Sequence, residues 1–397
     1  MTDGEQRAAL AVVRSLGRAG HTVYVCSGTG RSLAGASRYA RADLRMADPM
    51  RAPERFVDDV VAAIGPYRID TLIPITEPTL LAILPARGRV SDVLLPFATD
   101  EAFRAVSDKA AVLAAAARLG IAVPAQHTLD TPADAKTFPL ATLQFPIVVK
   151  PARSIATDTT GHAKFTVQHA SDAGALREIF HTLDARAYPV LLQQRIVGPG
   201  VGLFLLVWDG DIVAAFSHRR LREKPPAGGV SVYAESIPLD PELTARSRAL
   251  LDTVGWRGVA MVEYKIDART GVPYLMEING RFWGSLQLAV DAGVDFPALL
   301  LQAASGHSPA PVTVYRVGAR NRWEWGDIDH LLTRLRHSDR ELALPPGSAS
   351  RPRAVLAWLR SVLAPPRGER SEVFRWTDPR PFIRESRAWV STVLEGR

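Results

Sequence analysis

Apolar residues at helical spacing open the chain. From Gly4 to Gly20 they recur three and four positions apart, which predicts an amphipathic helix that ends at the glycines. His21–Cys26 then has the composition of a strand, as do Thr71–Ile75 and Val93–Phe97, with helical segments between them. Strands that alternate with helices indicate a parallel sheet with helices on its faces. We therefore expect an α/β domain over residues 1–120.

Both ends of this region carry boundary signals. A fold of this kind normally opens with a strand, and Met1–Gly4 looks like the end of one, so we expect the chain to start inside a strand. Ser107–Gly120 is a predicted helix with a capping residue at its beginning and a glycine at its end. Because Ile121–Ala125 follows as an extended linker, we place the first domain boundary near residue 120.

The pattern between residues 121 and 309 favours hairpins over strand–helix alternation. Leu203–His218 places Asp209-Gly210, which suits a two-residue turn, between two β-rich runs. Gly258–Asn279 is a second predicted hairpin, turning at Ala268–Gly271. These hairpins indicate an α+β domain or a pair of subdomains. The other predicted elements are strands at Phe145–Lys150 and Pro189–Arg195 and helices at Ser171–Arg186, Pro241–Val254, Trp283–Ala292 and Phe296–Gly306.

The composition changes again beyond residue 310. Arg, Trp and Pro become frequent, as in Asn321–Asp327, and Leu344–Ser348 and Ala364–Gly368 have the Pro and Gly content of loops. Arg353–Leu363 is a predicted amphipathic helix. We expect residues 310–397 to form a small, mainly helical C-terminal appendage that packs on the body.

Overall composition narrows the class of protein. The 397 residues are 47% hydrophobic and 22% charged, which is typical of two or three globular domains. The net charge of +7 comes from arginines interspersed with acidic residues, so we do not expect nucleic-acid binding. The single cysteine, Cys26, excludes a disulfide framework. With no apolar run of about 20 residues and a polar N-terminus, a cytoplasmic protein outside the membrane is expected.

The hairpin over residues 258–279 concentrates polar side chains on one face. Alternate residues of a strand share a face, so the pattern predicts one polar and one apolar side. We expect the polar face to carry Glu263, Lys265 and Asp267 from the first strand and Glu277, Asn279 and Arg281 from the second, and the apolar face to carry Val262, Tyr264, Ile266, Met276 and Ile278.

Two interpretations of this polar face are open. One is a solvated surface with ion pairs. The other is a magnesium site, because Mg²⁺ takes one or two carboxylates and keeps its other positions for water and phosphates. Glu277 and Asn279 lie two positions apart inside an apolar strand, directly before Arg281, and this arrangement favours the metal site.

Four segments, in this order, resemble the ATP-grasp superfamily, in its carboxylate–amine ligase branch related to carbamoyl-phosphate synthase and biotin carboxylase. They are Lys109 in Ser-Asp-Lys-Ala-Ala, Lys150 in Val-Val-Lys-Pro-Ala, Gln193–Gly198 and the acidic hairpin. The resemblance covers about residues 1–310. It implies a pre-ATP-grasp domain over 1–120 and a two-subdomain ATP-grasp domain over 121–309, with ATP and Mg²⁺ (or Mn²⁺) as cofactors.

The resemblance also implies roles for individual residues. Lys150 contacts ATP phosphates, which agrees with the need of a lysine at the end of a buried strand for an anionic partner. Lys109 opens a helix, where its ammonium and the helix N-terminus both face phosphate. The remaining implied roles are adenine binding by Gln193, Gln194 and the backbone of Ile196, metal binding by Glu263, Glu277 and Asn279, contact with substrate or the transferred phosphoryl by Arg281, and a mobile lid at Ser154–Gly161. Lys150 and Arg281 are the candidate catalytic residues.

Two further groups are candidates for binding the substrates. Arg219, Arg220 and Arg222 follow a predicted strand, and a guanidinium pairs with a carboxylate through two hydrogen bonds. A charged, exposed turn is the alternative interpretation of these arginines. Glu77 follows a predicted strand at its C-terminal end, where open α/β sheets bind ligands, and is a candidate for contact with the amine.

The activity that the resemblance implies is ATP-dependent ligation of a small-molecule carboxylate to an amine through an acyl phosphate, with release of ADP and phosphate. Related enzymes are often homodimers. Two alternatives stay open at this point. One is another ATP-grasp reaction, such as carboxylation or phosphoryl transfer, and the other is a non-catalytic nucleotide-binding regulatory protein.

Overall fold

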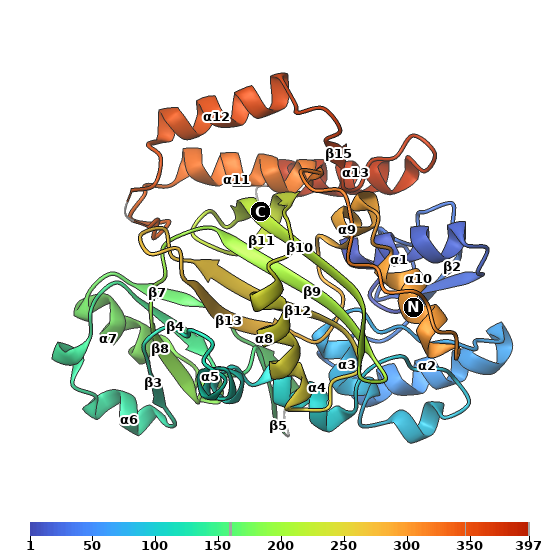
Figure 1. The fold of residues 1–397 in the computed structure, drawn as a ribbon, viewed down its shortest axis with the longest axis horizontal. Helices are drawn as coiled ribbons and strands as arrows, with labels where there is room; N and C mark the ends of the chain where they lie inside the picture. Colours follow the sequence, from blue (N-terminus) through green and yellow to red (C-terminus); the bar gives the residue numbers. More distant parts are fainter. Residues whose placement is uncertain (159–160, 346, 396–397) are drawn as a thin grey trace.

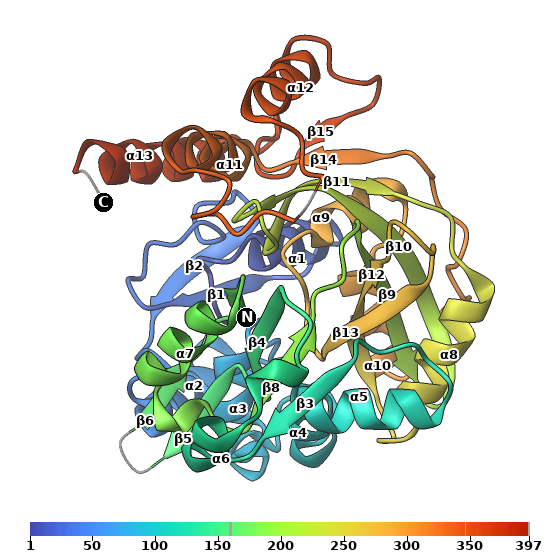
Figure 2. The same cartoon turned by 90° about the vertical axis from the view of Figure 1, so that its left-hand side faces the viewer.

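The computed structural model describes residues 1–158, 161–345 and 347–395. A large sheet occupies the centre of the molecule, with a small four-stranded sheet at its lower left, the N-terminal region at its right and the C-terminal helices above it (Figure 1). The same layers are seen from the side in Figure 2. This mixture of α/β and α+β regions confirms the predicted fold class.

The N-terminal region is built on short parallel pairings. Strand β1 pairs in parallel with β2, and Thr71 and Leu94 form a parallel bridge. The predicted strands 71–75 and 93–97 are therefore extended segments joined by one bridge rather than full strands. The elements are α1 (Arg7–Arg18), β1 (Val23–Ser27), β2 (Ala40–Arg45), α2 (Pro53–Tyr67), α3 (Glu77–Ile83) and α4 (Asp100–Ser107).

Met1 and Thr2 lie between β1 and the segment at Ile73. The Met1 carbonyl accepts a hydrogen bond from the Cys26 amide at 2.7 Å, and the Thr2 amide donates to the Ile73 carbonyl at 3.2 Å. These bonds on both sides place the first two residues in the middle of the parallel layer, as expected for the end of a strand.

A small antiparallel sheet follows, in the order β3-β8-β4-β7. Helices α6 and α7 pack on one of its faces, over a core that contains Ile147, Val149 and Leu192. Because neighbours in a strand alternate, Lys150 lies on the opposite face. The elements are α5 (Lys109–Arg118), β3 (Gln126–Leu129), α6 (Pro132–Thr137), β4 (Ile147–Pro151), β5 (Ile155–Asp158), β6 (Gly161–Lys164), β7 (Gln168–Ala170), α7 (Ala173–Thr182) and β8 (Val190–Gln194).

The large sheet has the order β13-β12-β9-β10-β11-β14-β15 and contains both predicted hairpins. The first turns at Asp209 and Gly210, whose φ angles of 48° and 91° suit a two-residue turn. Helix α8 begins at Pro241, capped by Asp240 as expected. The elements are β9 (Gly200–Trp208), β10 (Asp211–Lys224), β11 (Val230–Ser236), α8 (Pro241–Asp252), β12 (Gly258–Ile266), β13 (Pro273–Asn279), α9 (Leu286–Ala292) and α10 (Phe296–Ala304).

A β-bulge at Met276 corrects one part of the predicted hairpin. Glu263 pairs with Glu277, but Tyr264 pairs with Leu275, so Met276 is the extra residue. The Met276 sulfur lies 4.0 Å from the Lys150 Nζ. It therefore does not share the apolar face with Ile278, because simple alternation does not allow for an inserted residue.

The C-terminal appendage is mainly helical, as predicted, but it also extends the large sheet. Strand β14 pairs antiparallel with β11, and β15 pairs in parallel with β14. Residues beyond 310 thus cover the edge of β11 that would otherwise be open. The elements are β14 (Arg320–Arg322), α11 (Glu324–Arg336), α12 (Arg351–Leu363), β15 (Arg370–Ser371) and α13 (Arg380–Leu394).

A buried polar hub at Asp378 fixes the appendage to the N-terminal region. Asp378 accepts hydrogen bonds from Arg14 Nε at 2.9 Å, from Ser37 Oγ at 2.7 Å and from the Arg38 amide at 2.9 Å. Arg14 and Asp378 are both almost fully buried. An ion pair of this kind is strongly destabilising when one partner is lost, because the other charge stays buried.

Glu372 makes this interface sensitive to pH. Burial raises the pKa of Glu372 to about 7, although Arg7, which forms an ion pair with it, lowers the value. A carboxyl group whose pKa is higher in the folded than in the unfolded protein stabilises the fold while it is protonated. This stabilisation is complete at pH values below the unfolded-state pKa of the group and is lost as the pH rises through about 7. We expect the urea concentration at which half of the protein is unfolded to decrease as the pH rises from about 5.5 to about 8. Glu372→Gln should flatten that change, and an unaltered slope would contradict the assignment.

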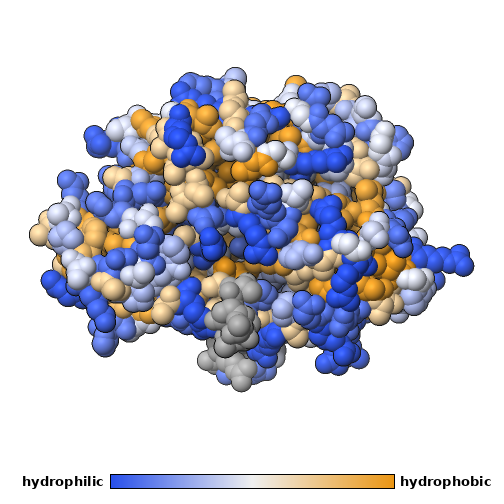
Figure 3. Space-filling model, turned by 90° about the horizontal axis from the view of Figure 1, so that it is seen from below, coloured by the Kyte–Doolittle hydropathy of each residue, from blue (hydrophilic) through white to orange (hydrophobic). Residues whose placement is uncertain are grey.

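The surface seen from below carries hydrophilic residues between smaller hydrophobic areas (Figure 3). On the opposite side, α12 exposes Leu356, Leu359 and Leu363. Within the part of the chain that the structure describes, no helix has the length and apolar character needed to cross a membrane.

Candidate active site

The acidic hairpin meets two lysines from other parts of the chain. Lys109 Nζ lies 3.6 Å from Glu277 Oε2 and donates a hydrogen bond to Ser154 Oγ at 2.8 Å. Asn279 Nδ2 donates to Glu277 Oε1 at 3.0 Å. With Lys150 beside Met276, the structure brings together residues that are up to 170 positions apart (109 to 279).

Local structure explains the position of Lys109. Lys109 is the first residue of α5, which Asp108 caps by accepting from the Ala111 amide at 3.1 Å. The Lys109 amide donates to the Ala152 carbonyl at 2.9 Å, which ties α5 to the end of β4. An ammonium at the N-terminus of a ten-residue helix makes a position that favours anions.

Charge is unevenly distributed within this cluster. Burial would raise the pKa of Glu277, but Lys109, Lys150 and the hydrogen bond from Asn279 lower it to about 2, so this carboxylate is ionised. Burial lowers the pKa of Lys150, although Glu277 and Glu263 oppose the shift. Among the described residues no carboxylate forms a direct ion pair with Lys150, so a bound anion would further stabilise this desolvated cation.

Substitution of Lys150 tests this electrostatic argument. We expect Lys150→Met to leave the folded protein equally or more stable, because a desolvated cation is replaced by an apolar chain next to Met276. Nucleotide binding should weaken about tenfold or more, since a charge-assisted contact is lost. Thermal shift with and without ATP measures both effects. A variant that binds ATP like the wild type would exclude Lys150 from the phosphate site.

Arg220 holds the other carboxylate of the hairpin. Its Nη1 donates to Glu263 Oε1 at 2.8 Å and its Nη2 pairs with Glu263 Oε2, while Nη1 also reaches Glu223 Oε1 at 2.9 Å. Burial alone would lower the pKa of Arg220, but Glu263 and Glu223 raise it above its usual value. Arg220 is therefore a permanently charged group inside the cluster.

The other two arginines of this segment lie outside the cluster. Arg219 pairs with Glu235, its Nε lying 2.8 Å from Glu235 Oε2. Arg222 binds Asp327 of α11 through two hydrogen bonds of 2.5 and 2.8 Å. Of the three arginines predicted as substrate ligands, Arg220 lies in the cluster. Alternation turns Arg219 to the other face, and a register shift in β10 between Arg220 and Arg222 separates Arg222 from it.

Glu77 reaches the cluster from the N-terminal region. It is the first residue of α3, and burial raises its pKa while Arg281 and Lys109 lower it. Arg281 Nη2 donates to Asn279 Oδ1 at 3.2 Å, and its Nη1 donates to the Phe282 carbonyl. Glu77 and Arg281 therefore form the side of the cluster that faces the N-terminal region.

The segment expected to bind adenine is only partly directed at the cluster. Gln193 is buried and donates from Nε2 to Gln126 Oε1 at 2.7 Å, on the face of the small sheet that carries Lys150. Gln194 is exposed on the other face, so the structure does not bring its side chain to the cluster. Ile196 is buried, and Gly198 allows close approach, because an added Cβ would lie 1.8 Å from the Ile266 carbonyl oxygen.

Three cationic or titratable side chains lie near Lys150: Lys265, which was expected on the polar face of the hairpin, and His169 and Arg195, which were not predicted as site residues. Lys265 and Arg195 lower the pKa of His169, after burial, to about 4. Within the described residues, His169 Nδ1 and Arg195 Nη2 are buried without a hydrogen-bond partner. Lys265 was predictable because it lies two positions after Glu263 on the same strand. His169 was not, because it lies on β7, a strand that the sequence did not predict.

The donor set fits magnesium. Glu263 and Glu277 are directly opposite each other on neighbouring strands, and Asn279 follows on the same strand. Within the described residues, no group of three or more His, Cys, Asp or Glu side chains is arranged for a metal. Two carboxylates with an amide oxygen suit a cation that also binds phosphates and water. Residues 159 and 160 of the predicted lid, Ser154–Gly161, lie outside the described residues. Its first residue, Ser154, contacts the cluster by accepting a hydrogen bond from Lys109.

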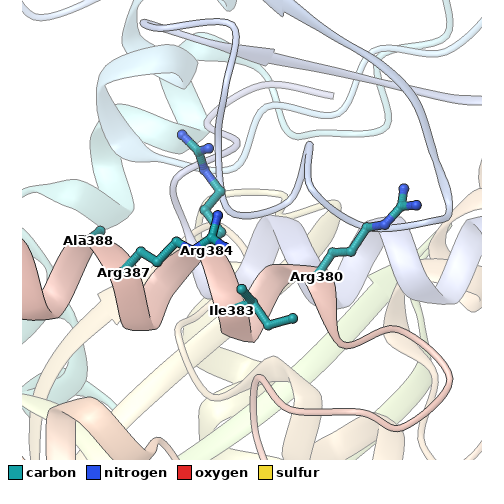
Figure 4. Close-up of a pocket in the computed structure, with 5 residues that line it drawn as sticks. All are labelled: Arg380, Ile383, Arg384, Arg387 and Ala388. Atoms are coloured by element: carbon teal, nitrogen blue, oxygen red, sulfur yellow. The ribbon is translucent and has the colours of Figure 1, made fainter.

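Two pockets lie away from this cluster. One is on α13, where Arg380, Ile383, Arg384, Arg387 and Ala388 line it (Figure 4). The other lies between the segment Ser91–Phe97 and Trp208. Neither contains a residue of the cluster, so the chemistry of the site is identified from its side chains rather than from the depth of a pocket.

The chain is similar to several known proteins. Residues 187–324 match a family model described as ATP-grasp in the biosynthetic pathway with Ter operon. An L-amino acid ligase from Bacillus licheniformis has a TM-score of 0.59 and 19% identity, covering 76% of this chain and 73% of that chain. A biotin carboxylase complex from Campylobacter jejuni has a TM-score of 0.59 and 15% identity, covering 80% and 73%.

An N5-carboxyaminoimidazole synthetase from Staphylococcus aureus has a TM-score of 0.60 and 14% identity, covering 80% of this chain and 79% of that chain. No curated protein sequence is significantly similar to this chain. Identities at this level are a likeness of fold, and the reaction has to be argued from the side chains.

Proposed function

Because this chain has the ATP-grasp fold, we propose that it is an ATP-dependent ligase that joins a small-molecule carboxylate to an amine. One observation carries the proposal: the ionised Glu277 lies opposite Glu263, 3.6 Å from Lys109, and its pKa is lowered by both Lys109 and Lys150, which come from two other regions of the chain. Carboxylates that face each other beside desolvated cations suit a metal–triphosphate complex better than a surface ion-pair network.

Each residue of the cluster has a physical role in this proposal. Lys150 and Lys109 offset negative charge on the phosphates, and Glu263, Glu277 and Asn279 would hold Mg²⁺, which stabilises charge on the phosphate oxygens when it is bound. Gln193 and the backbone near Ile196 would bind the base. These roles agree with the positions of the side chains on the facing surfaces of the two sheets.

The reaction balances in two steps. A carboxylate oxygen of the substrate bonds to the γ-phosphorus of ATP as the bond to ADP breaks, which gives an acyl phosphate. The amine nitrogen then bonds to the acyl carbon, phosphate leaves, and the amine loses a proton. Arg281 is placed to bind the carboxylate or the transferred phosphoryl group, and Glu77, with its raised pKa, to meet the amine.

A coupled assay tests the proposal. The protein is incubated with ATP, Mg²⁺ and sets of carboxylates and amines, and ADP release is recorded together with the product mass. Release that needs both a carboxylate and an amine, with an amide product, is expected. ATP binding without turnover on any pair would indicate a regulatory protein instead.

A second candidate reaction is carboxylation. It is favoured by the similarity to solved structures named as a biotin carboxylase and an N5-carboxyaminoimidazole synthetase, at TM-scores of 0.59 and 0.60 against 0.59 for the amino acid ligase. ADP release that requires bicarbonate and no second carboxylate would select it. A stable phosphorylated substrate would select phosphoryl transfer.

A further inference from the structure

We infer that Arg220 is a positioning residue that competes with the metal for Glu263. It holds this carboxylate through two contacts, and a metal would have to displace it before Glu263 became a chelating ligand. The inference deepens the proposed function and rests on it, because it concerns the same metal site. It assigns to Arg220 a role that its two neighbours, Arg219 and Arg222, do not share.

The first step of the argument is the occupancy of Glu263. Arg220 binds both oxygens of this carboxylate, through Nη1 at 2.8 Å and through Nη2. The two side chains are 9% and 15% exposed, so water competes weakly for the pair. A two-point guanidinium–carboxylate contact takes the lone pair of each oxygen that a chelating metal would use, and it leaves a positive charge beside the cation. Chelation of a metal through both oxygens of Glu263 and the two-point Arg220 contact therefore exclude each other.

The second step concerns the partners that Arg220 keeps when it loses Glu263. Its Nη1 also donates to Glu223 Oε1 at 2.9 Å and to the Gly229 carbonyl at 3.2 Å. When Glu263 turns to the metal, Arg220 keeps a carboxylate partner in Glu223 and stays charged. The loss of the Glu263 contact thus does not leave an unpaired buried cation, and the exchange is energetically feasible.

The third step is the fixed frame around this exchange. The backbone of this part of β10 is held by α11: Arg222 binds Asp327, Lys224 pairs with Asp329, and His330 Nδ1 lies 2.6 Å from the Glu223 carbonyl. Because these contacts hold the strand, the exchange is confined to the side chains of Glu263 and Arg220. The appendage thereby sets the distance between Arg220 and Glu263.

The test is Mn²⁺ binding, measured by electron paramagnetic resonance in the presence of a non-hydrolysable ATP analogue. Arg220→Lys keeps the positive charge but cannot bind both oxygens of Glu263, and Arg220→Gln removes the charge as well. We expect both variants to bind Mn²⁺ about tenfold more tightly than the wild type, which corresponds to about 1.4 kcal/mol. Arg219→Lys and Arg219→Gln are the matched controls and should bind like the wild type.

The outcomes separate two failures. If the wild type binds no Mn²⁺ with the nucleotide, the proposed function is overturned together with this inference. If the wild type binds but Arg220→Lys is unchanged and only Arg220→Gln binds more tightly, a general charge effect replaces the competition. Should both variants unfold, Glu223→Gln decides: it leaves Glu263 as the sole carboxylate partner of Arg220, so Mn²⁺ binding should weaken, and unchanged binding overturns the inference.

Discussion

Replacing Glu277 with glutamine is expected to reduce ATP turnover by a factor on the order of a thousand. A metal at such a site stabilises transition-state charge by several kcal/mol, and each 1.4 kcal/mol or so corresponds to a factor of ten in rate. Glutamine keeps the size of the side chain but removes its negative charge. In the wild type the Glu277 carboxyl group is ionised, because its pKa is lowered to about 2. Substrate-dependent ADP release gives the measurement.

Two controls accompany this prediction. Glu242→Gln makes the same chemical change at a side chain that is 73% exposed on α8, and it should leave turnover unaltered. Far-ultraviolet circular dichroism and thermal unfolding show whether the Glu277→Gln protein is folded, since Lys109 and Lys150 lose a counter-charge in it. A folded Glu277→Gln protein with wild-type turnover would exclude the hairpin as the metal site.

Replacing Asp378 with alanine is expected to destabilise the protein by about 3–5 kcal/mol, because Arg14 would keep a buried charge without its partner. The Ser37 hydroxyl and the Arg38 amide also lose their acceptor. The free energy of unfolding in urea measures the total effect. Limited proteolysis of residues 370–395 reports whether the appendage separates from the N-terminal region before the body unfolds.

The double variant Arg14→Met/Asp378→Ala tests the cause. If the loss arises from the unpaired charge of Arg14, removing that charge should recover part of the stability, although the Arg38 amide still lacks an acceptor. If the changes in the free energy of unfolding caused by Arg14→Met and by Asp378→Ala are additive in the double variant, the two side chains contribute independently. In that case the hub would not be an ion-pair interaction.

Regular elements were predictable where local chemistry decides them. The hairpin at Asp209-Gly210 follows from left-handed backbone angles that this dipeptide adopts easily, and α8 follows from its Asp240 cap and Pro241. Strands β14 and β15 were missed because they have only three and two residues and form through pairing, β14 with β11 and β15 with β14. Their formation depends on tertiary contacts that a local pattern does not contain.

The residues of the site were predictable as types but not as partners. Alternation placed Glu263, Glu277 and Asn279 on one face, and the register confirms the pairing of the two glutamates. The partner of Glu263 was not predictable, since Arg219, Arg220 and Arg222 look equivalent in sequence and only the register shifts in β10 separate them. The bulge at Met276 likewise arises from the pairing of two strands, which a pattern in one strand does not show.

The late position of Asp378 has a consequence for biosynthesis. A ribosome adds about 5–20 residues per second, so the segment that binds Arg14 is made tens of seconds after α1. During that time the partner of Arg14 has not yet been made. The edge of β11 is likewise open from its own synthesis until β14 is translated, and an unpaired strand edge on a nascent chain is prone to aggregation.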